Sequence, residues 1–221
     1  MKMERLQNQL ETIYGINVDF NVDDFLITDE TLAHQLDTSE NARKVKEKLL
    51  ISQQGENLDL SLYIDSGVIE HLALDNPFKE LHNGNLTDFW IALEGVSHFL
   101  YLTWNAFFEK RVTLLELELQ AEVDKFICSV CLLSQQNAGQ LPPLLRPFLF
   151  QADDFDEALD EGSLTRYKDA NFYAGKYCFQ LEEKFLKTET NPKAIFSELR
   201  HFYRLPQGEK IRRIQTQAYR A

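Results

Sequence analysis

The fold of this chain is decided by residues 86–133, which read LTDFWIALEGVSHFLYLTWNAFFEKRVTLLELELQAEVDKFICSVCLL. In the first half, apolar residues recur at the three- and four-residue spacing of one helix face. That face carries Leu86, Phe89, Leu93, Val96, Leu100, Trp104 and Phe107. Because Ile91, Phe99 and Leu102 fall on other sides, the sequence predicts a helix over 86–110 that is buried almost all round.

The same stretch contains a helix boundary. Lys110 and Arg111 suit a helix C-terminus, and Thr113 followed by Glu116 has the T-x-x-E form of a capping box. We therefore predict a second helix over 113–137, antiparallel to the first. Its apolar residues form two stripes on opposite sides, which indicates packing on two faces. The first stripe contains Val112, Leu115, Leu119, Val123, Phe126, Val130 and Leu133, and the second Leu114, Leu117, Ala121, Cys128 and Leu132.

Four polar residues interrupt the apolar pattern of this hairpin. Glu94 and His98 are four residues apart, and so are Glu118 and Glu122, which puts each pair on one side of its helix. With the turn near residue 110, antiparallel partners have numbers that sum to about 221, so His98 should lie within a residue of Glu122. Imidazole and carboxylate groups from facing helices bind iron, manganese or zinc. One interpretation is therefore a divalent metal site formed by all four residues.

The other interpretation is a structural network of ion pairs and hydrogen bonds between His98 and a glutamate. The carboxylate-bridged bundle pattern repeats Glu-x-x-His, whereas this chain has a single Glu94-Gly-Val-Ser-His98 with one extra residue. It also lacks the His-Glu-x-x-His signature of zinc hydrolases. Glu118 and Glu122 repel each other unless a cation compensates, and Lys125 is close enough to do so. We expect the network and keep the metal site as the alternative.

The N-terminal part predicts a helix and a small sheet. Apolar residues recur at helical spacing within residues 1–15, and residues 16–22 alternate like a half-buried strand. Residues 45–64 predict a β-hairpin, because alternating apolar residues follow the turn-like residues 53–56. A two-stranded hairpin is marginal alone, so it should gain a third strand from residues 16–28 or lie against helices.

Helical periodicity takes over from residue 66. Besides the two hairpin helices it predicts helices over 66–82, 163–188, 193–204 and 207–219. Pro142, Pro143 and Pro147 mark a connector, because proline cannot donate a hydrogen bond inside a helix. The sequence thus predicts an α+β, mainly α fold built on a central antiparallel helix hairpin at about 86–137. We expect a single domain over 1–221, with an N-terminal helix and small sheet layer in 1–65 and a helical bundle in 66–221.

Composition narrows the classes of function. The chain has 221 residues, a formal net charge of -12 and an estimated pI of 4.9, which disfavours general binding to nucleic acids. No apolar stretch approaches the roughly 18 residues of a membrane span, and residues 1–15 lack the apolar core of an export signal. Three cysteines do not suggest a disulfide framework, so we expect a cytoplasmic protein that does not enter the membrane.

Charge is uneven along the chain. An acidic stretch contains Asp153, Asp154, Asp156, Glu157, Asp160 and Glu161, and a basic C-terminal arm contains Arg200, Arg204, Lys210, Arg212, Arg213 and Arg220. We expect solvated helix faces or pairing between the two segments. The alternatives are an arm that docks an acidic partner or contacts nucleic acid weakly.

Other motifs predict core packing. Cys128 and Cys131 have C-x-x-C spacing but lie deep within a predicted helix, away from the helix N-terminus that makes such thiols reactive. The aromatic residues Tyr167, Phe172, Tyr173, Tyr177 and Phe179 recur near helical spacing. The remaining histidines, at positions 34, 71, 82 and 201, have no ligand-like spacing, and we expect them at the surface.

Together these features favour a non-catalytic cytoplasmic interaction protein, such as an adaptor, a regulatory subunit or a chaperone-like partner of another protein. The alternative is a metal-dependent bundle enzyme, hydrolytic or oxidative. In it, Glu94, His98, Glu118 and Glu122 would act as metal ligands or as general acid and base. The sequence leaves open whether the chain is an enzyme and how it assembles.

Overall fold

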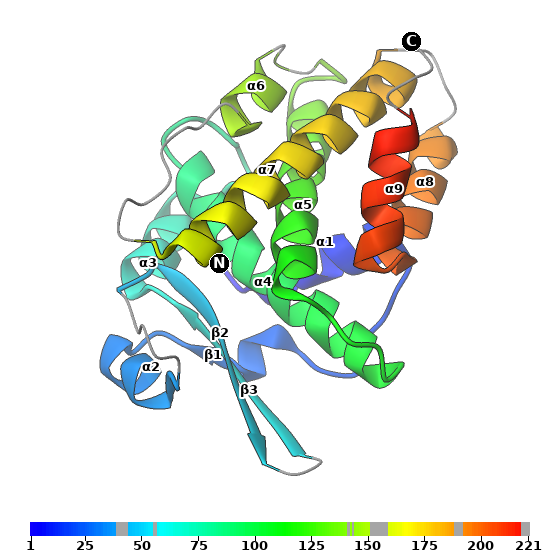
Figure 1. The fold of residues 1–221 in the computed structure, drawn as a ribbon. Helices are drawn as coiled ribbons and strands as arrows, with labels where there is room; N and C mark the ends of the chain where they lie inside the picture. The colour runs from blue at the N-terminus through cyan, green and yellow to red at the C-terminus, as the bar shows by residue number, and fades with distance from the viewer. Residues whose placement is uncertain are drawn as a thin grey trace.

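The computed structural model describes residues 1–38, 44–54, 57–140, 142, 144–150, 159–187 and 192–217. Within these residues a small sheet accompanies a mainly helical body (Figure 1). The predicted α+β, mainly α fold is therefore confirmed.

The predicted helix hairpin forms the centre of the molecule, as α4 (Leu86–Phe107) and α5 (Leu114–Gln136). The Thr113 hydroxyl accepts a hydrogen bond from the Glu116 amide, so α5 begins at the capping residue that the sequence predicts. Polar contacts between the two helices fix their register, and one of them is the hydrogen bond of 2.9 Å from Trp90 Nε1 to Ser129 Oγ. As predicted, α4 is buried on several sides, since both Leu93 and Phe99 are 0% exposed.

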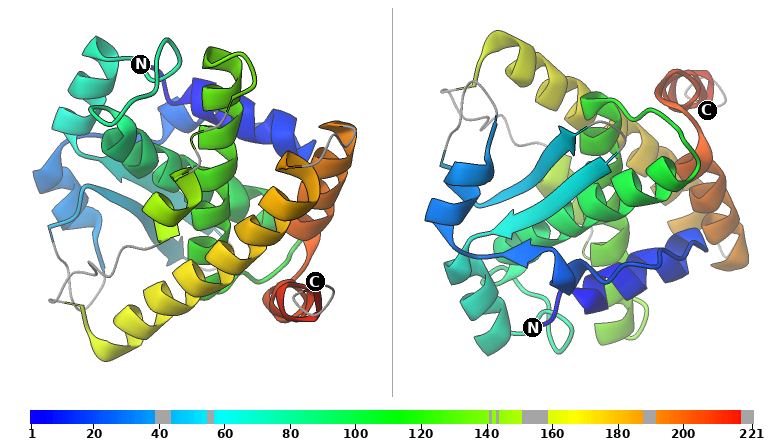
Figure 2. Two further views of the ribbon diagram at one scale, coloured as in Figure 1. Left: turned by 90° about the horizontal axis from the view of Figure 1, so that it is seen from above. Right: turned by 90° about the horizontal axis from the view of Figure 1, so that it is seen from below.

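The sheet contains the predicted hairpin, formed by β2 (Glu47–Gln54) and β3 (Asn57–Ile64), with Leu49 opposite Leu62. A third strand, β1 (Leu26–Ile27), pairs with β3 in parallel orientation, so the strand order is β1-β3-β2. The sheet also packs against α4 (Figure 2, right). The hairpin is thus supported in both of the expected ways.

Residues 16–22 do not form the strand that their alternation predicts. They form a loop that leads into the short 3-10 helix η1 (Val22–Asp24). In α1 (Glu4–Tyr14), Gln7 accepts a hydrogen bond from the Val22 amide and donates one to the Phe20 carbonyl. Because a side chain of α1 satisfies these backbone groups, the loop needs no partner strand.

The predicted helix over 66–82 ends early, as α3 (Ser66–Leu74). Pro77 explains the end, because a proline disfavours helical backbone in the residue before it. Two short helices were not predicted, namely α2 (Glu30–Leu36), which Asp29 caps, and α6 (Leu145–Phe150) in the proline connector. Both are too short for their periodicity to be recognised in the sequence.

The remaining helices surround the hairpin. Helix α7 (Glu161–Leu181) packs along α5 and continues into a π-helical turn, η2 (Glu182–Leu186). Helix α8 (Pro192–Arg204) lies beside α1, and α9 (Gln207–Gln217) lies beside α7 (Figure 1). One hydrophobic core joins the N-terminal helix, the sheet, the hairpin and the C-terminal helices, through residues that include Leu6, Leu62, Phe99, Tyr177 and Ile214.

Several cations of the basic C-terminal arm contact the chain itself. Arg200 and Arg204 donate hydrogen bonds to backbone carbonyls of residues 12–15, at the C-terminal end of α1. Arg213 forms an ion pair with Glu198 at 2.6 Å. Carbonyls at a helix C-terminus attract cations, so Arg200 and Arg204 fasten α8 to α1, whereas Arg213 of α9 fastens α9 to α8.

Part of the predicted charge pattern lies outside the described residues, namely Asp153, Asp154, Asp156, Glu157 and Arg220, together with Pro143. Among the helices that the structure describes, none is long and apolar enough to cross a membrane.

Candidate metal centre in the helix hairpin

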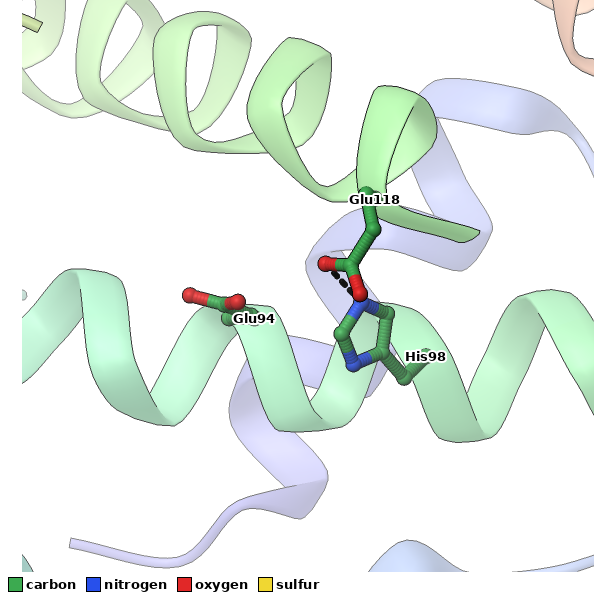
Figure 3. A group of neighbouring side chains, drawn as sticks. All are labelled: Glu94, His98 and Glu118. Atoms are coloured by element: carbon green, nitrogen blue, oxygen red, sulfur yellow. Dashed lines mark ion pairs between the residues drawn. The ribbon is translucent and has the colours of Figure 1, made fainter. Parts of the chain in front are cut away.

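Three of the four predicted polar residues meet between α4 and α5 (Figure 3). One ligand atom each from Glu94, His98 and Glu118 lies within 4.8 Å of the others. Glu94 and His98 project from neighbouring turns of α4, and Glu118 points down at them from α5. His98 and Glu118 are buried, whereas the side chain of Glu94 is 20% exposed, so solvent reaches the group at Glu94.

The histidine lies between two carboxylates from different elements. Its Nε2 is 3.5 Å from Glu118 Oε2, and its Nδ1 is 3.7 Å from Glu47 Oε1. Within the described residues, His98 Nε2 and Glu47 Oε2 are both buried and have no hydrogen-bond partner. Buried polar atoms usually have hydrogen-bond partners in proteins, so these two atoms make the group a candidate for binding a further partner.

Glu47, the first residue of β2, is the site residue that the sequence did not predict. The approach of β2 to α4 brings it to His98, and Gly95 permits that approach. A Cβ at Gly95 would lie 2.9 Å from Glu47 Oε2 and 2.8 Å from a methyl carbon of Leu62. A glycine inside a buried helix was the available signal, because it marks close approach of a neighbouring element.

Glu122, the fourth predicted residue, belongs to an adjoining ion pair and is not part of the group of three. Its Oε1 accepts a hydrogen bond of 2.8 Å from Lys125 Nζ, and the same Nζ is 2.7 Å from Glu94 Oε2. Lys125 therefore compensates Glu122, as the sequence predicts, but its second partner is Glu94 and not Glu118. His98 meets Glu118, one turn earlier in α5 than the predicted neighbour Glu122.

A third cation approaches from α7, where Arg166 Nε is 3.7 Å from Glu118 Oε1. The cluster formed by Glu47, Glu94, His98, Glu118, Glu122, Lys125 and Arg166 thus draws on β2, α4, α5 and α7. Four carboxylates face one imidazole, one ammonium and one guanidinium, so the cluster can neutralise much of its own charge. The same side chains therefore also fit the structural network that the sequence favours.

The pKa values in this cluster depart from their ordinary range. Burial lowers the pKa of His98, but Glu118, Glu47 and Glu94 outweigh it and raise that pKa to about 9. Burial raises the pKa of Glu47 to about 8 against the attraction of His98. Burial also opposes ionisation of Glu94, yet Lys125 and His98 lower the pKa of this carboxyl overall. One protonated and one ionised carboxyl beside a histidine form a set that can hold and exchange protons.

A second buried polar cluster lies on the other side of the hairpin and was not predicted. Asp124 accepts hydrogen bonds from the Tyr14 hydroxyl, from Ser97 Oγ at 2.6 Å and from Gln120 Nε2 at 2.9 Å. Gln120 Oε1 in turn accepts one from Lys210 Nζ at 2.8 Å. These hydrogen bonds pair the polar atoms with one another, and the cluster joins α1, α4, α5 and α9.

The other motifs behave as predicted or nearly so. Cys128 is buried inside α5 and burial raises its thiol pKa, which agrees with core packing. His34, His82 and His201 are exposed, whereas His71 is half-buried and its Nδ1 lies 2.5 Å from Asp88 Oδ2.

The aromatic residues of α7 divide between core and surface. Tyr177 is 0% exposed and stacks on Phe202, as core packing predicts. Phe172 and Phe179 are 55% and 46% exposed, so the prediction of core packing is wrong for these two.

Comparison with known proteins gives no family for this chain: no family model, no curated protein and no solved structure matches it.

Proposed function

We propose that this protein is a metalloprotein that binds one divalent transition-metal ion through Glu94, His98 and Glu118, with Glu47 beside them. Two observations carry the proposal: one ligand atom each from Glu94, His98 and Glu118 lies within 4.8 Å of the others, and the buried His98 Nε2 makes no hydrogen bond within the described residues. This is the metal-dependent alternative that the sequence left open. It makes the chain a candidate enzyme of the hydrolytic or oxidative kind.

The donor set supports this choice. One imidazole nitrogen with carboxylate oxygens is a ligand set found with zinc, iron and manganese, and three protein ligands leave a coordination position free for water or substrate. The ligand atoms are somewhat farther apart than ligands that share one ion, with bonds of about 2.0–2.2 Å, so small side-chain rotations must draw them together. A bound ion would displace the proton that the raised pKa of about 9 keeps on His98 at neutral pH, and it would bond to Nε2 in place of that proton.

The surroundings support orientation of these ligands. Glu47 Oε1 lies 3.7 Å from His98 Nδ1 and can accept a hydrogen bond from its N–H after a small movement, which leaves Nε2 directed at Glu118. Arg166 and Lys125 hold Glu118 and Glu94 from outside the group. A divalent ion placed there would polarise a bound water or a substrate oxygen. Glu94, which is partly exposed, would be the group on the solvent side.

The test is elemental analysis of untagged protein that has been purified without chelator, before and after reconstitution with zinc, manganese or ferrous iron. Wild type should hold about one ion per chain. His98→Ala and the isosteric Glu118→Gln should lose the metal, whereas His71→Ala, in a half-buried pair with Asp88, should keep it. Circular dichroism checks that each variant is folded. Absence of metal from wild type after reconstitution would leave a structural ion-pair network and overturn the proposal.

A second candidate function, binding of another protein, is favoured by the exposed tip of the hairpin. Phe107, Phe108 and Leu114 are 78%, 51% and 58% exposed, and the rings of Phe107 and Phe108 contact each other at 5.3 Å. Exposed apolar groups of this kind mark interaction sites. If a partner co-purifies from native extract, Phe107→Ser should release it and Leu74→Ser, at a residue that is 89% exposed, should not. Release by both or by neither would exclude the tip.

The cellular compartment is a proposal as well. All three cysteines are free thiols, and Cys128 and Cys178 are buried, which supports a reducing compartment such as the cytoplasm.

A further inference from the structure

A second cation position adjoins the group of Glu94, His98 and Glu118, and a lysine of the chain fills it. Lys125 Nζ is 2.7 Å from Glu94 Oε2 and 2.8 Å from Glu122 Oε1. The side chain of Lys125 is 11% exposed, and those of Glu94 and Glu122 are 20% and 19% exposed. Glu94 is thus shared, because it faces His98 and Glu118 on one side and the ammonium on the other.

The arrangement requires a cation at this point. Glu94 and Glu122 come from facing helices, and their oxygen atoms lie within hydrogen-bond distance of one nitrogen. Two ionised carboxylates held so close in a buried place repel each other strongly unless a positive charge lies between them. In a centre with two metal ions, the second ion would supply that charge, and the shared carboxylate would bridge the two ions.

The neighbouring position differs in one respect. Its cations are His98 and Arg166, yet His98 Nε2 stays without a hydrogen bond, and the carboxylate oxygens lie 3.5–3.7 Å from their cations. The Lys125 contacts, at 2.7 and 2.8 Å, are a full hydrogen-bond fit. Lys125 therefore fills the position between Glu94 and Glu122. The position beside His98 and Glu118 has looser contacts and remains open to an ion.

We propose that Lys125 is a built-in substitute for a second metal ion, so that the native centre takes one divalent ion beside a fixed ammonium. Removal of the lysine side chain then opens a second divalent-cation site, with Glu94 as a shared ligand and Glu122 as its own ligand. This inference rests on the proposed metal-binding function. It explains why Glu122 is present in the cluster but does not approach His98.

The experiment counts Mn²⁺ ions bound per chain, by equilibrium dialysis followed by elemental analysis. Wild type should bind one ion and Lys125→Ala should bind two. Lys125→Arg keeps a cation at the position and should bind one. The double variant Lys125→Ala with Glu122→Gln removes the ligand of the second site and should return to one. Electron paramagnetic resonance provides a second readout, because two Mn²⁺ ions that share Glu94 lose the separate six-line signal of an isolated ion.

The outcomes separate this inference from the proposed function. One ion in wild type and one in Lys125→Ala would overturn the inference and leave the proposed function intact. No ion in wild type would overturn the proposed function, and the inference with it. Two ions bound to wild type would show that Lys125 does not take the place of a second metal ion, and this result would overturn the inference. If Lys125→Ala folds only with Mn²⁺ present, ions are counted on the folded fraction after gel filtration, and two ions per chain support the inference while one overturns it.

Discussion

Ser97 and His98 are neighbours in the sequence, but their side chains enter two different buried polar clusters. Ser97 Oγ donates a hydrogen bond of 2.6 Å to Asp124, in the cluster that reaches α1 and α9. His98 faces Glu118 and Glu47, in the cluster that reaches β2 and α7. Successive residues of a helix point about 100° apart, so one helix can supply both clusters. The two clusters are expected to respond differently to mutation, since His98 Nε2 and Glu47 Oε2 lack hydrogen bonds in the part of the chain that the structure describes.

Tyr14 and Tyr203 provide a matched pair of substitutions. Their rings stack at 4.2 Å and both are buried, but the Tyr14 hydroxyl bonds to Asp124, whereas the Tyr203 hydroxyl has no hydrogen-bond partner among the described residues. Tyr14→Phe should lower the free energy of unfolding by about 1–2 kcal/mol, because Asp124 and Gln120 each lose a hydrogen bond. Tyr203→Phe should leave it unchanged or raise it. Urea denaturation measures both, and equal losses would contradict the assigned pairing.

Because Lys210 is buried, we expect the free energy of unfolding to depend on pH. Burial lowers the pKa of its ammonium to about 7, against the attraction of Glu116 and Asp124. Above pH 7 the folded state releases the proton while the unfolded chain keeps it up to its ordinary pKa near about 10.4, so stability from this group rises with pH. The slope is at most about 1.4 kcal/mol per pH unit. Below pH 7 both states are protonated and the contribution is constant.

Lys210→Met is the variant that isolates this effect. The difference in unfolding free energy, wild type minus variant, should grow from pH 7 to 10, and a smaller change near pH 6 comes from Asp124, whose pKa of about 6 the ammonium lowers. Glu47 and His98 titrate in the same range, but they are present in both proteins, so they cancel in the difference. A constant difference from pH 6 to 10 would mean that Lys210 stays charged in the folded protein.

Gly95 and Gly208 should respond to alanine in opposite directions. A Cβ at Gly95 meets Leu62 at 2.8 Å, and Leu62 is 0% exposed and cannot move into solvent. Gly95→Ala should therefore destabilise the protein by about 1–3 kcal/mol, the usual cost of overpacking. At Gly208 in α9 a Cβ meets nothing within 4 Å, so Gly208→Ala should stabilise by about 0.5 kcal/mol. Thermal unfolding checks both, and a neutral Gly95→Ala would disprove the close approach of β3 to α4.

The cations that hold the ligand carboxylates predict a graded effect on metal binding. Arg166 Nε lies 3.7 Å from Glu118 Oε1, outside hydrogen-bond distance, whereas Lys125 bonds Glu94 at 2.7 Å. Arg166→Met should change the affinity for Mn²⁺ by less than about tenfold, since the guanidinium orients a ligand without binding it tightly. Glu94→Gln should weaken the affinity by more than tenfold. If Arg166→Met lost more Mn²⁺ affinity than Glu94→Gln, Glu94 would not be a metal ligand.

Local rules account for what the sequence predicted well. The hairpin of α4 and α5, the cap at Thr113 and the β2–β3 hairpin all follow from periodicity and end signals that act within a few residues. The spacing of Glu94 and His98 placed them on one side of α4 for the same reason. The local pattern predicted wrongly where contacts with another element decided the structure. The backbone of residues 16–22, for example, forms hydrogen bonds with side chains of α1 and not with a strand.

The sequence by itself determined the mainly helical fold, its central hairpin and the polar residues that stand at the hairpin interface, because helix periodicity is a property of consecutive residues. Only the tertiary structure decided that His98 meets Glu118 and Glu47, and that Lys125 pairs with Glu94 of the facing helix. Those choices depend on how far two helices slide past each other and on how closely β2 approaches Gly95. Packing of side chains distant in the chain sets these quantities, and no single stretch of sequence encodes them.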